Sequence, residues 1–384
     1  MEAIIVTGDK YPCEDAGAIR QHAIAKILQC IGYKVIVIGY GTPTDGKILE
    51  YDGVEFLSYR VNTTNVIAKV FNRLIFGHKA LSFIKSRKTN VDIILVVDIL
   101  PVAFKRIERY SMRKNIKILH DSVEWYSPEE FSKGRYDIEY QIKNLVNTRI
   151  IKNNWRVIAI SNYLEEHFKK VCKKVIKVPV VMDIDKIEYR VDLIKQEKKI
   201  FSYVGGPGKK DYLKEIIEGF LMLEEEYLSQ LELHIVGVNY EQLVYVCDLD
   251  KERLKESRKF LVAHGRLPHV EAVKWVRDSD FTLLLRDETL RYAKAGFPTK
   301  VVESLSYGTP MICNLSSDLS DYLYDMQNSV LIKGHNPKDV KEAIQRALYI
   351  NEMDYIKMRK NARKSAEKFF DYKIYCDRVK ELLD

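Results

Sequence analysis

Residues 286–303, RDETLRYAKAGFPTKVVE, gather four cations around a Gly-Phe-Pro-Thr turn that leads into a short helical pattern. Pro298 suits the first turn of a helix, and Gly308 suits the residue after its end. The first N–H groups of a helix lack partners within the helix and attract anions, and Arg286 and Lys300 would add full positive charge beside them. We therefore expect this segment to bind a phosphate-type anion.

Glu303 lies inside the same helical pattern, where its carboxylate could accept hydrogen bonds from sugar hydroxyls. An isolated glutamate is more often a surface residue, so only the neighbouring anion site favours a functional role. Pro298 and Thr299, at the start of the helix, belong to the same expected site.

A glycine-rich segment, GGPGKKDYL (205–213), is a second candidate phosphate site between a strand pattern and a helix. Gly205 and Gly206 would let the backbone approach an anion closely because they lack a Cβ atom, and Lys209 and Lys210 would supply charge. The segment matches neither G-x-x-x-x-G-K-[ST] nor G-x-G-x-x-G. A glycine-rich connection with two solvated lysines is the alternative interpretation.

A third strand-end segment, HGRLPH (264–269), could offer backbone groups of Arg266 and Leu267 to a nucleobase. A plain βα loop explains this segment equally well.

In the first half of the chain, ILHDSVEWYSPEEF (118–131) combines ionisable groups with aromatic faces, a mixture suited to gripping a sugar. The candidates for catalysis or acceptor binding there are His120, Asp121, Glu124, Trp125 and Tyr126. The loop at 8–17 leads into a helix, so Gly17 could let a phosphate or an acceptor approach that helix start.

The elements that must position these residues follow from the apolar pattern. At 384 residues the chain exceeds the usual size of one domain, and nearly continuous apolar runs alternate with helical patterns, as in buried parallel sheets. The charged segment 182–199 interrupts this alternation and is the expected linker. We therefore expect an α/β protein with two doubly wound, Rossmann-like domains, residues 1–188 and 199–368, facing each other across a cleft. The expected strands are 3–8, 35–39, 54–59, 91–98, 116–121, 156–161, 175–181, 200–205, 231–237, 259–265, 280–285, 309–314 and 329–333.

The net charge of +8 indicates anionic partners but does not choose among them. An apolar and basic helical pattern at 66–88 fits a helix lying on anionic lipid, or a core-packed helix with a solvated basic edge. The six cysteines are scattered without metal-ligand spacing, and no secretion signal or membrane-spanning run occurs. We expect a cytoplasmic protein without a metal site.

Together these residues resemble the retaining GT-B glycosyltransferases of family 4, especially bacterial members that build surface polysaccharides. The strongest part is AGFPTKVVESLSYGTPMI (295–312), which is similar to the family's donor-binding signature. The resemblance implies that Glu303 holds the donor ribose. It also places Ala295 where the family usually has a second glutamate, so that the backbone of Ala295, Gly296 and Phe297 would contact the donor sugar instead.

The same resemblance implies further roles. The family's diphosphate arginine falls at Gly206 and its lysine at Lys209 or Lys210, so Arg286 would supply the missing charge. His120 resembles the family histidine near the transferred sugar. Residues 369–384 resemble the last helix of the fold, which returns to the N-terminal domain.

We expect a retaining glycosyltransferase that moves a sugar from a UDP- or GDP-sugar to a hydroxyl of a glycan or polyprenyl-linked acceptor in bacterial polysaccharide synthesis. It would need no cofactor, metal or nucleic acid, and it could sit at the inner face of the cell membrane. The alternatives are a sugar-nucleotide epimerase of the same architecture, and a basic binding module for membranes or nucleic acid.

Overall fold

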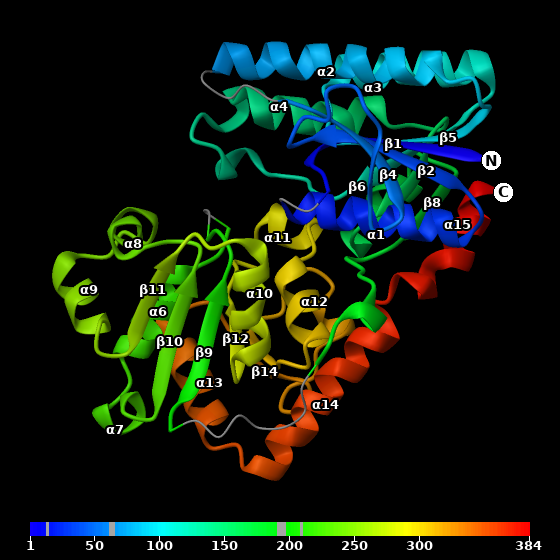
Figure 1. The fold of residues 1–384 in the computed structure, drawn as a ribbon. Coiled ribbons are helices and arrows are strands. Elements are labelled where there is room, and N and C mark those ends of the chain that lie inside the picture. Colours follow the sequence, from blue (N-terminus) through cyan, green and yellow to red (C-terminus); the bar gives the residue numbers. More distant parts are fainter. Residues whose placement is uncertain (13–14, 61–65, 190–196, 208–209) are drawn as a thin grey trace. The chain divides into compact units, whose positions relative to one another are not determined.

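The computed structural model describes residues 1–12, 15–60, 66–189, 197–207 and 210–384. The chain is an α/β protein built around two sheets, and it divides into two compact units (Figure 1). Residues 1–183, 295–297 and 371–384 form the first unit, and residues 184–294 and 298–370 form the second.

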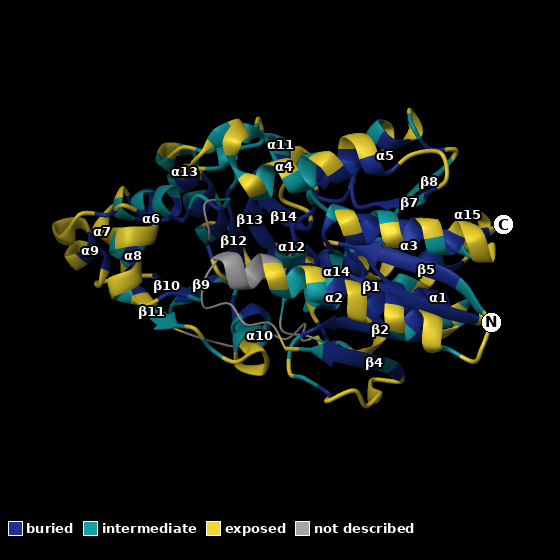
Figure 2. Cartoon of the chain, turned by 90° about the horizontal axis from the view of Figure 1, so that it is seen from above, coloured by how far each residue is buried: buried dark blue, intermediate teal, exposed yellow. Residues whose placement is uncertain are grey.

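The first unit contains an eight-stranded sheet in the order β3-β4-β2-β1-β5-β6-β7-β8. All neighbouring strands are parallel except β3, which runs antiparallel to β4. The central strands are buried on both faces, as Figure 2 shows, which explains their continuous apolar runs. The strands are β1 (Glu2–Lys10), β2 (Lys34–Tyr40), β3 (Leu49–Tyr51), β4 (Val54–Tyr59), β5 (Val91–Val97), β6 (Lys117–Ser122), β7 (Arg156–Ala159) and β8 (Lys174–Lys177).

Helices cover both faces of this sheet. Helix α1 begins after Asp15, whose side chain accepts a hydrogen bond from the Ala18 N–H, and its apolar face packs against the last helix of the chain, α15. Helices α2 and α3 pack against each other. The helices are α1 (Ala16–Cys30), α2 (Val66–Ser86), α3 (Pro101–Lys114), α4 (Ile138–Leu145), α5 (Asn162–Lys169) and α15 (Cys376–Leu383).

The second unit contains a six-stranded, fully parallel sheet in the order β11-β10-β9-β12-β13-β14. Phe201 of β9 stacks on Phe281 of β12 with ring centroids 5.6 Å apart, and helix α6 packs on α13. The strands are β9 (Lys199–Val204), β10 (Leu231–Val236), β11 (Leu261–Gly265), β12 (Phe281–Leu284), β13 (Met311–Cys313) and β14 (Ser329–Leu331). The helices are α6 (Leu213–Leu221), α7 (Glu225–Leu228), α8 (Tyr240–Val246), α9 (Lys251–Ser257), α10 (His269–Asp278), α11 (Arg291–Ala295), α12 (Thr299–Ser306), α13 (Pro337–Leu348) and α14 (Glu352–Phe369).

Each of the thirteen expected runs contains a strand, and the predicted fold class of two Rossmann-like parallel sheets is confirmed. Strand β3 was not expected, because its three residues are exposed and carry no apolar run. The expected linker overlaps residues 190–196, which lie outside the described residues. In the part of the chain that is described, no helix has the length and apolar character needed to cross a membrane.

In both sheets the strand order reverses beside the first strand of the unit. Strand β1 lies between β2 and β5, and strand β9 lies between β10 and β12. In open α/β sheets this is the position where a crevice forms at the carboxyl ends of the strands and ligands bind. The residues that follow β1, β5, β9 and β12 therefore lie where sheets of this kind bind their ligands.

Candidate active site

The turn after β9 is built from glycines that permit a close approach. Gly205 has φ of +127°, and a Cβ atom there would lie 2.9 Å from Cε of Lys300. Gly237, at the end of the neighbouring β10, has φ of +125°, and its Cβ would lie 2.3 Å from the carbonyl oxygen of Gly205. Among the described residues, which exclude 208–209, a Cβ added at Gly206 would meet nothing within 4 Å. The turn thus needs glycine at 205 and 237.

Two predicted cations meet beside this turn on one buried carboxylate. Asp211 Oδ1 accepts from Arg286 Nε at 2.9 Å, and its Oδ2 accepts from Lys300 Nζ at 2.7 Å. The hydroxyl of Tyr203 also donates to Oδ2 at 2.7 Å. The Asp211 side chain is only 3% exposed, whereas those of Arg286 and Lys300 are 13% and 20% exposed. The structure therefore brings Arg286 and Lys300 together and leaves both partly open to solvent.

The charge state of Asp211 follows from these neighbours. Burial alone would raise the pKa of Asp211, but Lys300 and Arg286 hold the pKa below its usual value. Asp211 is therefore ionised at neutral pH, and the cluster of two cations and one carboxylate keeps a net positive charge. Sequence reasoning missed Asp211, although it follows the GGPGKK segment directly.

The backbone at Arg286 is also fixed. The side-chain oxygen of Asn314 accepts from the Arg286 N–H at 3.1 Å, and its amide donates to the Arg286 carbonyl at 2.6 Å. Asn314 follows β13, which pairs with β12, so two adjacent strand ends hold Arg286 in place.

Of the two loop lysines, Lys209 lies outside the described residues. The Lys210 carbonyl accepts from the Tyr292 hydroxyl at 2.6 Å, and its ammonium lies 5.9 Å from the Tyr292 ring centroid. This anchors the end of the loop to α11.

The predicted short helix is α12, which begins at Thr299 after an N-cap at Pro298. Pro298 provides no side-chain hydrogen bond to the first N–H groups of the helix. Glu303, in the middle of α12, is half-buried, and burial raises its pKa to about 7 against the attraction of Lys300. Among the described residues no group donates a hydrogen bond to its carboxylate, which leaves that carboxylate available to a hydroxyl ligand.

Residues 295–297, which precede α12, belong to the first unit of the chain. Ala295 and Phe297 are buried and Gly296 is partly exposed. Arg266 and Leu267 follow β11, at the edge of the second sheet, where Arg266 is exposed and Leu267 is half-buried.

In the first unit, His120 is a buried residue of β6. Its Nδ1 donates to the Val96 carbonyl at 3.0 Å, and its ring packs against Phe104, Trp155 and Phe168. Burial lowers the pKa of His120, so the ring is neutral near pH 7. Because Nδ1 carries the proton, Nε2 is an acceptor.

Asp121 lines a small pocket of the first unit, but its side chain is fully buried and held by other side chains, and its catalytic role stays a prediction. Its carboxylate is 0% exposed and accepts from Arg20 Nη2 and from Gln21 Nε2, each at 2.7 Å. Arg20 also donates to the Pro179 carbonyl at 2.7 Å. Asp121 therefore joins β6 to α1. The sequence alone could not show this, because it does not reveal that Arg20 and Gln21 are the partners of the Asp121 carboxylate.

A small pocket lies beside His120 in the first unit, lined also by Asp98, Glu124, Lys143 and Asn147. Lys143 Nζ lies 3.1 Å from Glu124 Oε2 and 3.6 Å from Asp98 Oδ1. Burial opposes the lysine charge, but Asp98 and Glu124 hold the pKa of Lys143 well above its usual value. Sequence reasoning missed Asp98 and Lys143. The strand-end position of Asp98 could have revealed it, whereas Lys143 lies in α4 without any local signal.

The two predicted aromatic residues are tied to the same region. Tyr126 donates its hydroxyl to Glu124. Trp125 Nε1 donates to Asn144 at 3.1 Å, and its ring lies 4.3 Å from the His167 ring, centroid to centroid. The structure therefore brings His120 and Glu124 to one pocket, with Tyr126 bound to Glu124 and Trp125 packed nearby.

Gly17 does not offer the open phosphate approach that we expected. A Cβ atom at Gly17 would lie 2.0 Å from Asp9 Oδ1, so this glycine makes room for a carboxylate of β1. Burial and the Asp98 charge raise the pKa of Asp9 to about 8. A carboxyl group already occupies the space over Gly17 and would repel phosphate whenever it is ionised.

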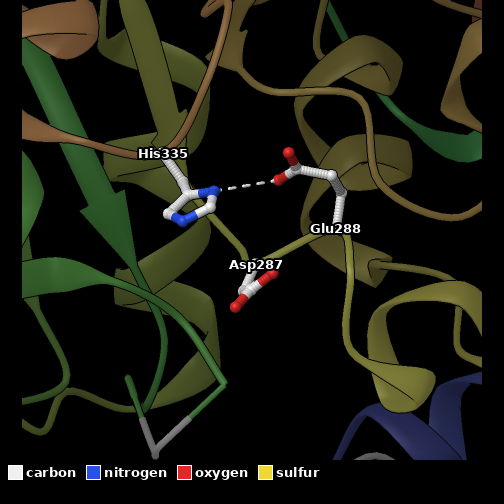
Figure 3. Close-up of side chains that lie close together, drawn as sticks. All are labelled: Asp287, Glu288 and His335. Atoms are coloured by element: carbon white, nitrogen blue, oxygen red, sulfur yellow. Dashed lines mark hydrogen bonds and ion pairs between the residues drawn. The ribbon is translucent and has the colours of Figure 1, made fainter.

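A second cluster of ionisable groups joins the loop after β12 to the loop after β14 (Figure 3). Ligand atoms of Asp287, Glu288 and His335 lie within 4.8 Å of one another and could hold a metal ion. His335 Nδ1 lies 3.2 Å from Glu288 Oε2, which also accepts from Asn314 at 2.9 Å. Asp287 accepts from the Thr289 N–H at 2.9 Å. This cluster supports Asn314, which in turn holds the backbone of Arg286.

Comparison with known proteins gives a family match for the second half of the chain. Residues 185–369 match the family model described as "Glycosyl transferases group 1". A protein of Methanocaldococcus jannaschii, described as an uncharacterized glycosyltransferase, is 22% identical over 292 residues, which cover 72% of this chain and 69% of that protein.

Solved structures match the whole chain. Sucrose-phosphate synthase from Thermosynechococcus elongatus has a TM-score of 0.77 at 15% identity, covering 100% of this chain and 98% of that chain. HepE of Anabaena, solved with UDP and glucose, has a TM-score of 0.72 at 14% identity, covering 100% of this chain and 99% of that chain. The chain thus has the fold of the GT-B glycosyltransferases, and the match over residues 185–369 supports glycosyl transfer as its activity.

Proposed function

We propose that the protein is a retaining glycosyltransferase that takes a sugar from a nucleoside-diphosphate sugar and transfers it to a hydroxyl. The observation that carries this proposal is the pair of partly exposed cations, Arg286 and Lys300, held on Asp211 beside the glycine turn of β9. This position, at the point where the strand order of the sheet reverses, is where a parallel α/β sheet binds its ligand.

The donor diphosphate would bind to the second unit. Departure of the nucleoside diphosphate builds up negative charge, and cations already fixed in place stabilise that charge more in the transition state than in the ground state. Arg286 and Lys300 would supply this stabilisation together with Lys210, and Glu303 would accept hydrogen bonds from the ribose. The backbone at 295–299 would contact the donor sugar, with Arg266 and Leu267 near the base. A UDP-sugar is the preferred donor because HepE, a structural neighbour, was solved with UDP and glucose, and a GDP-sugar is the alternative.

The acceptor would bind to the first unit. The pocket beside His120 offers two carboxylates, one ammonium group and a neutral imidazole, all of which can bind hydroxyl groups. The acceptor hydroxyl would attack from the face that the leaving phosphate occupies, and a phosphate oxygen would take its proton. No protein nucleophile or metal ion is then needed, because the protein cations carry the phosphate charge.

We further propose that the acceptor is a glycan or a polyprenyl-linked sugar in the synthesis of a bacterial surface polysaccharide. Such an acceptor would place the enzyme in the cytoplasm, at the inner face of the membrane. The net charge of +8 supports an anionic surface as a partner.

The test begins with a thermal-shift screen of UDP, GDP, ADP and TDP together with their sugars, because a ligand bound only by the folded state raises its stability. We expect UDP or GDP to raise the melting temperature. With the donor so identified, Lys210→Ala should lower turnover at least about tenfold, roughly 1.4 kcal/mol. Wild-type turnover in this folded variant, or no nucleotide binding at all, would contradict the site. Conversion of the donor sugar without any acceptor would favour an epimerase.

A further inference from the structure

Helices α2 and α3 form one surface of the first unit. They pack against each other, and Lys85 of α2 lies 5.8 Å from the ring centroid of Tyr110 on α3. Figure 2 shows exposed positions of both helices on the same face, side by side. We name this face, over residues 71–88 and 101–114, the α2–α3 face.

Its exposed charges are all positive. Residues 66–88 and 101–117 contain one carboxylate, Glu108. That carboxylate is buried, where it accepts from Lys105 Nζ at 2.8 Å and from Trp155 Nε1 at 2.9 Å. Within the described residues no ion pair neutralises any of the seven exposed cations of the α2–α3 face, which are Lys79, Lys85, Lys88, Arg106, Arg109, Arg113 and Lys114.

Large apolar side chains lie among these cations. Phe71 and Leu74 of α2 are 62% and 42% exposed, and Val102 and Met112 of α3 are 42% and 61% exposed. The alternative that the sequence left open, a core-packed helix with a basic edge, is correct for residues such as Phe76 and Ile84, which are 2% and 1% exposed. It does not account for the four exposed apolar side chains.

We propose that the α2–α3 face binds an anionic phospholipid surface. The cations would lie at the headgroups while Phe71, Leu74, Val102 and Met112 enter the boundary with the acyl chains. Each cation near an anionic bilayer strengthens binding by about fivefold. Polynucleotide would use the cations but not Leu74, Val102 and Met112, which offer no aromatic ring for a base to stack on, so the combination favours lipid. This assignment rests on the proposed function, which places the acceptor at a membrane, and it names the surface that docks there.

The experiment is flotation of the full chain with vesicles. One set contains equal parts of phosphatidylglycerol and phosphatidylcholine, and the other contains phosphatidylcholine alone. We expect the protein to float with the anionic vesicles only, and less at high salt. Failure to float with the anionic vesicles, or equal flotation with both sets, overturns the proposal. Binding to polynucleotide at a salt concentration where the vesicles bind nothing overturns it as well.

Two variants locate the surface. Arg106→Glu/Arg109→Glu/Arg113→Glu should lower the vesicle-bound fraction at least about tenfold, and Phe71→Ser/Met112→Ser should lower it without altering net charge. Because Lys251, Lys255 and Lys259 are exposed in the second unit, Lys251→Glu/Lys255→Glu/Lys259→Glu is the matched control, with the same change in charge and no expected loss. If the control loses binding as much as the α2–α3 variants do, net charge is the cause and the proposal fails.

The vesicle result does not depend on the enzyme's activity, since neither donor nor acceptor is present. Thermal shifts with UDP, measured on the same variants, should equal that of the wild type. A protein that floats but binds no nucleotide would contradict the proposed function and support lipid binding by the α2–α3 face. A protein that binds nucleotide but does not float would contradict lipid binding and support the nucleotide site.

Discussion

Asp211→Asn removes the charge that holds the two candidate diphosphate cations and changes the shape of the side chain very little. Loss of one partner from a buried ion pair costs about 3–5 kcal/mol. Arg286 and Lys300 are 13% and 20% exposed, and asparagine keeps one acceptor oxygen, so we expect a smaller loss of about 2–3 kcal/mol in the stability of the second unit. In a unit of this size, the melting temperature would fall by roughly 4–12 °C.

Asp211→Asn also distinguishes the positioning of Arg286 and Lys300 from their affinity for the diphosphate. With the carboxylate gone, the two cations attract the diphosphate at least as strongly as before, but their positions are no longer fixed. We expect kcat to fall at least about tenfold, while the dissociation constant of UDP, measured by calorimetry, does not rise. Asp248→Asn is the matched control, because the Asp248 side chain is fully exposed, and it should leave both the melting temperature and kcat unchanged.

The pH dependence of the stability difference has a definite sign. The folded-state pKa of Asp211 lies below the unfolded value of about 3.9, so its stabilising contribution is present above that pH and is lost as the pH falls through the folded-state pKa. The difference in melting temperature between wild type and Asp211→Asn should therefore stay constant from about pH 8 to pH 5 and shrink only below about pH 4. Unchanged melting temperature together with unchanged kcat would refute the role of Asp211.

Three further predictions concern the same unit. Arg286→Ala should raise the dissociation constant of UDP at least about tenfold in calorimetry, whereas Lys294→Ala, an exposed cation of the same stretch, should not change it. Because the folded-state pKa of Glu303 is raised to about 7, the ionised carboxylate destabilises the unliganded protein as the pH rises from about 4.5 to 7. Glu303→Gln should therefore melt higher than wild type at about pH 8 and at the same temperature at about pH 4.5, and equal melting at both would contradict this burial. Turnover should survive chelation by EDTA, and a Mn²⁺ stimulation that His335→Ala abolishes would show instead that the cluster of Figure 3 holds a metal.

The sequence was sufficient to predict most strands and the strand ends at which the candidate donor site lies. Nearly continuous apolar runs such as AIIV at 3–6 can be recognised because a strand buried on both faces needs apolar residues at successive positions. Arg286, Lys300 and Gly205 were identified because glycine turns and helix starts have local signals. Strand β3 has no such signal, since it is held by pairing with β4 and its side chains are exposed.

The partners of ionisable groups could not be predicted, because they come from distant parts of the chain. Asp121 is separated by about 100 residues from Arg20, and this pairing gives a candidate catalytic carboxylate a structural partner. Asp9 and Gly17 are close in sequence, yet the pattern of residues did not indicate that the Asp9 carboxylate occupies the space over Gly17. The local sequence shows where a charged side chain occurs, but the tertiary structure determines which groups form ion pairs and hydrogen bonds with it.

The charges at the strand ends of each unit favour donor binding by the second unit and acceptor binding by the first. Beside the strand-order reversal of the second sheet lie Arg286 and Lys300 with the ionised carboxylate of Asp211. The nearby Glu303 has a pKa raised to about 7 and carries only part of a negative charge at neutral pH, so the remaining excess of positive charge suits a diphosphate. Beside the strand-order reversal of the first sheet lie Asp98 and Glu124 with the single ammonium of Lys143, an excess of negative charge that disfavours phosphate and suits hydroxyl groups. If the donor instead bound to the first unit, Lys143→Ala would weaken UDP binding as much as Arg286→Ala does. We expect Lys143→Ala to raise the KM for the acceptor and to leave UDP affinity unchanged.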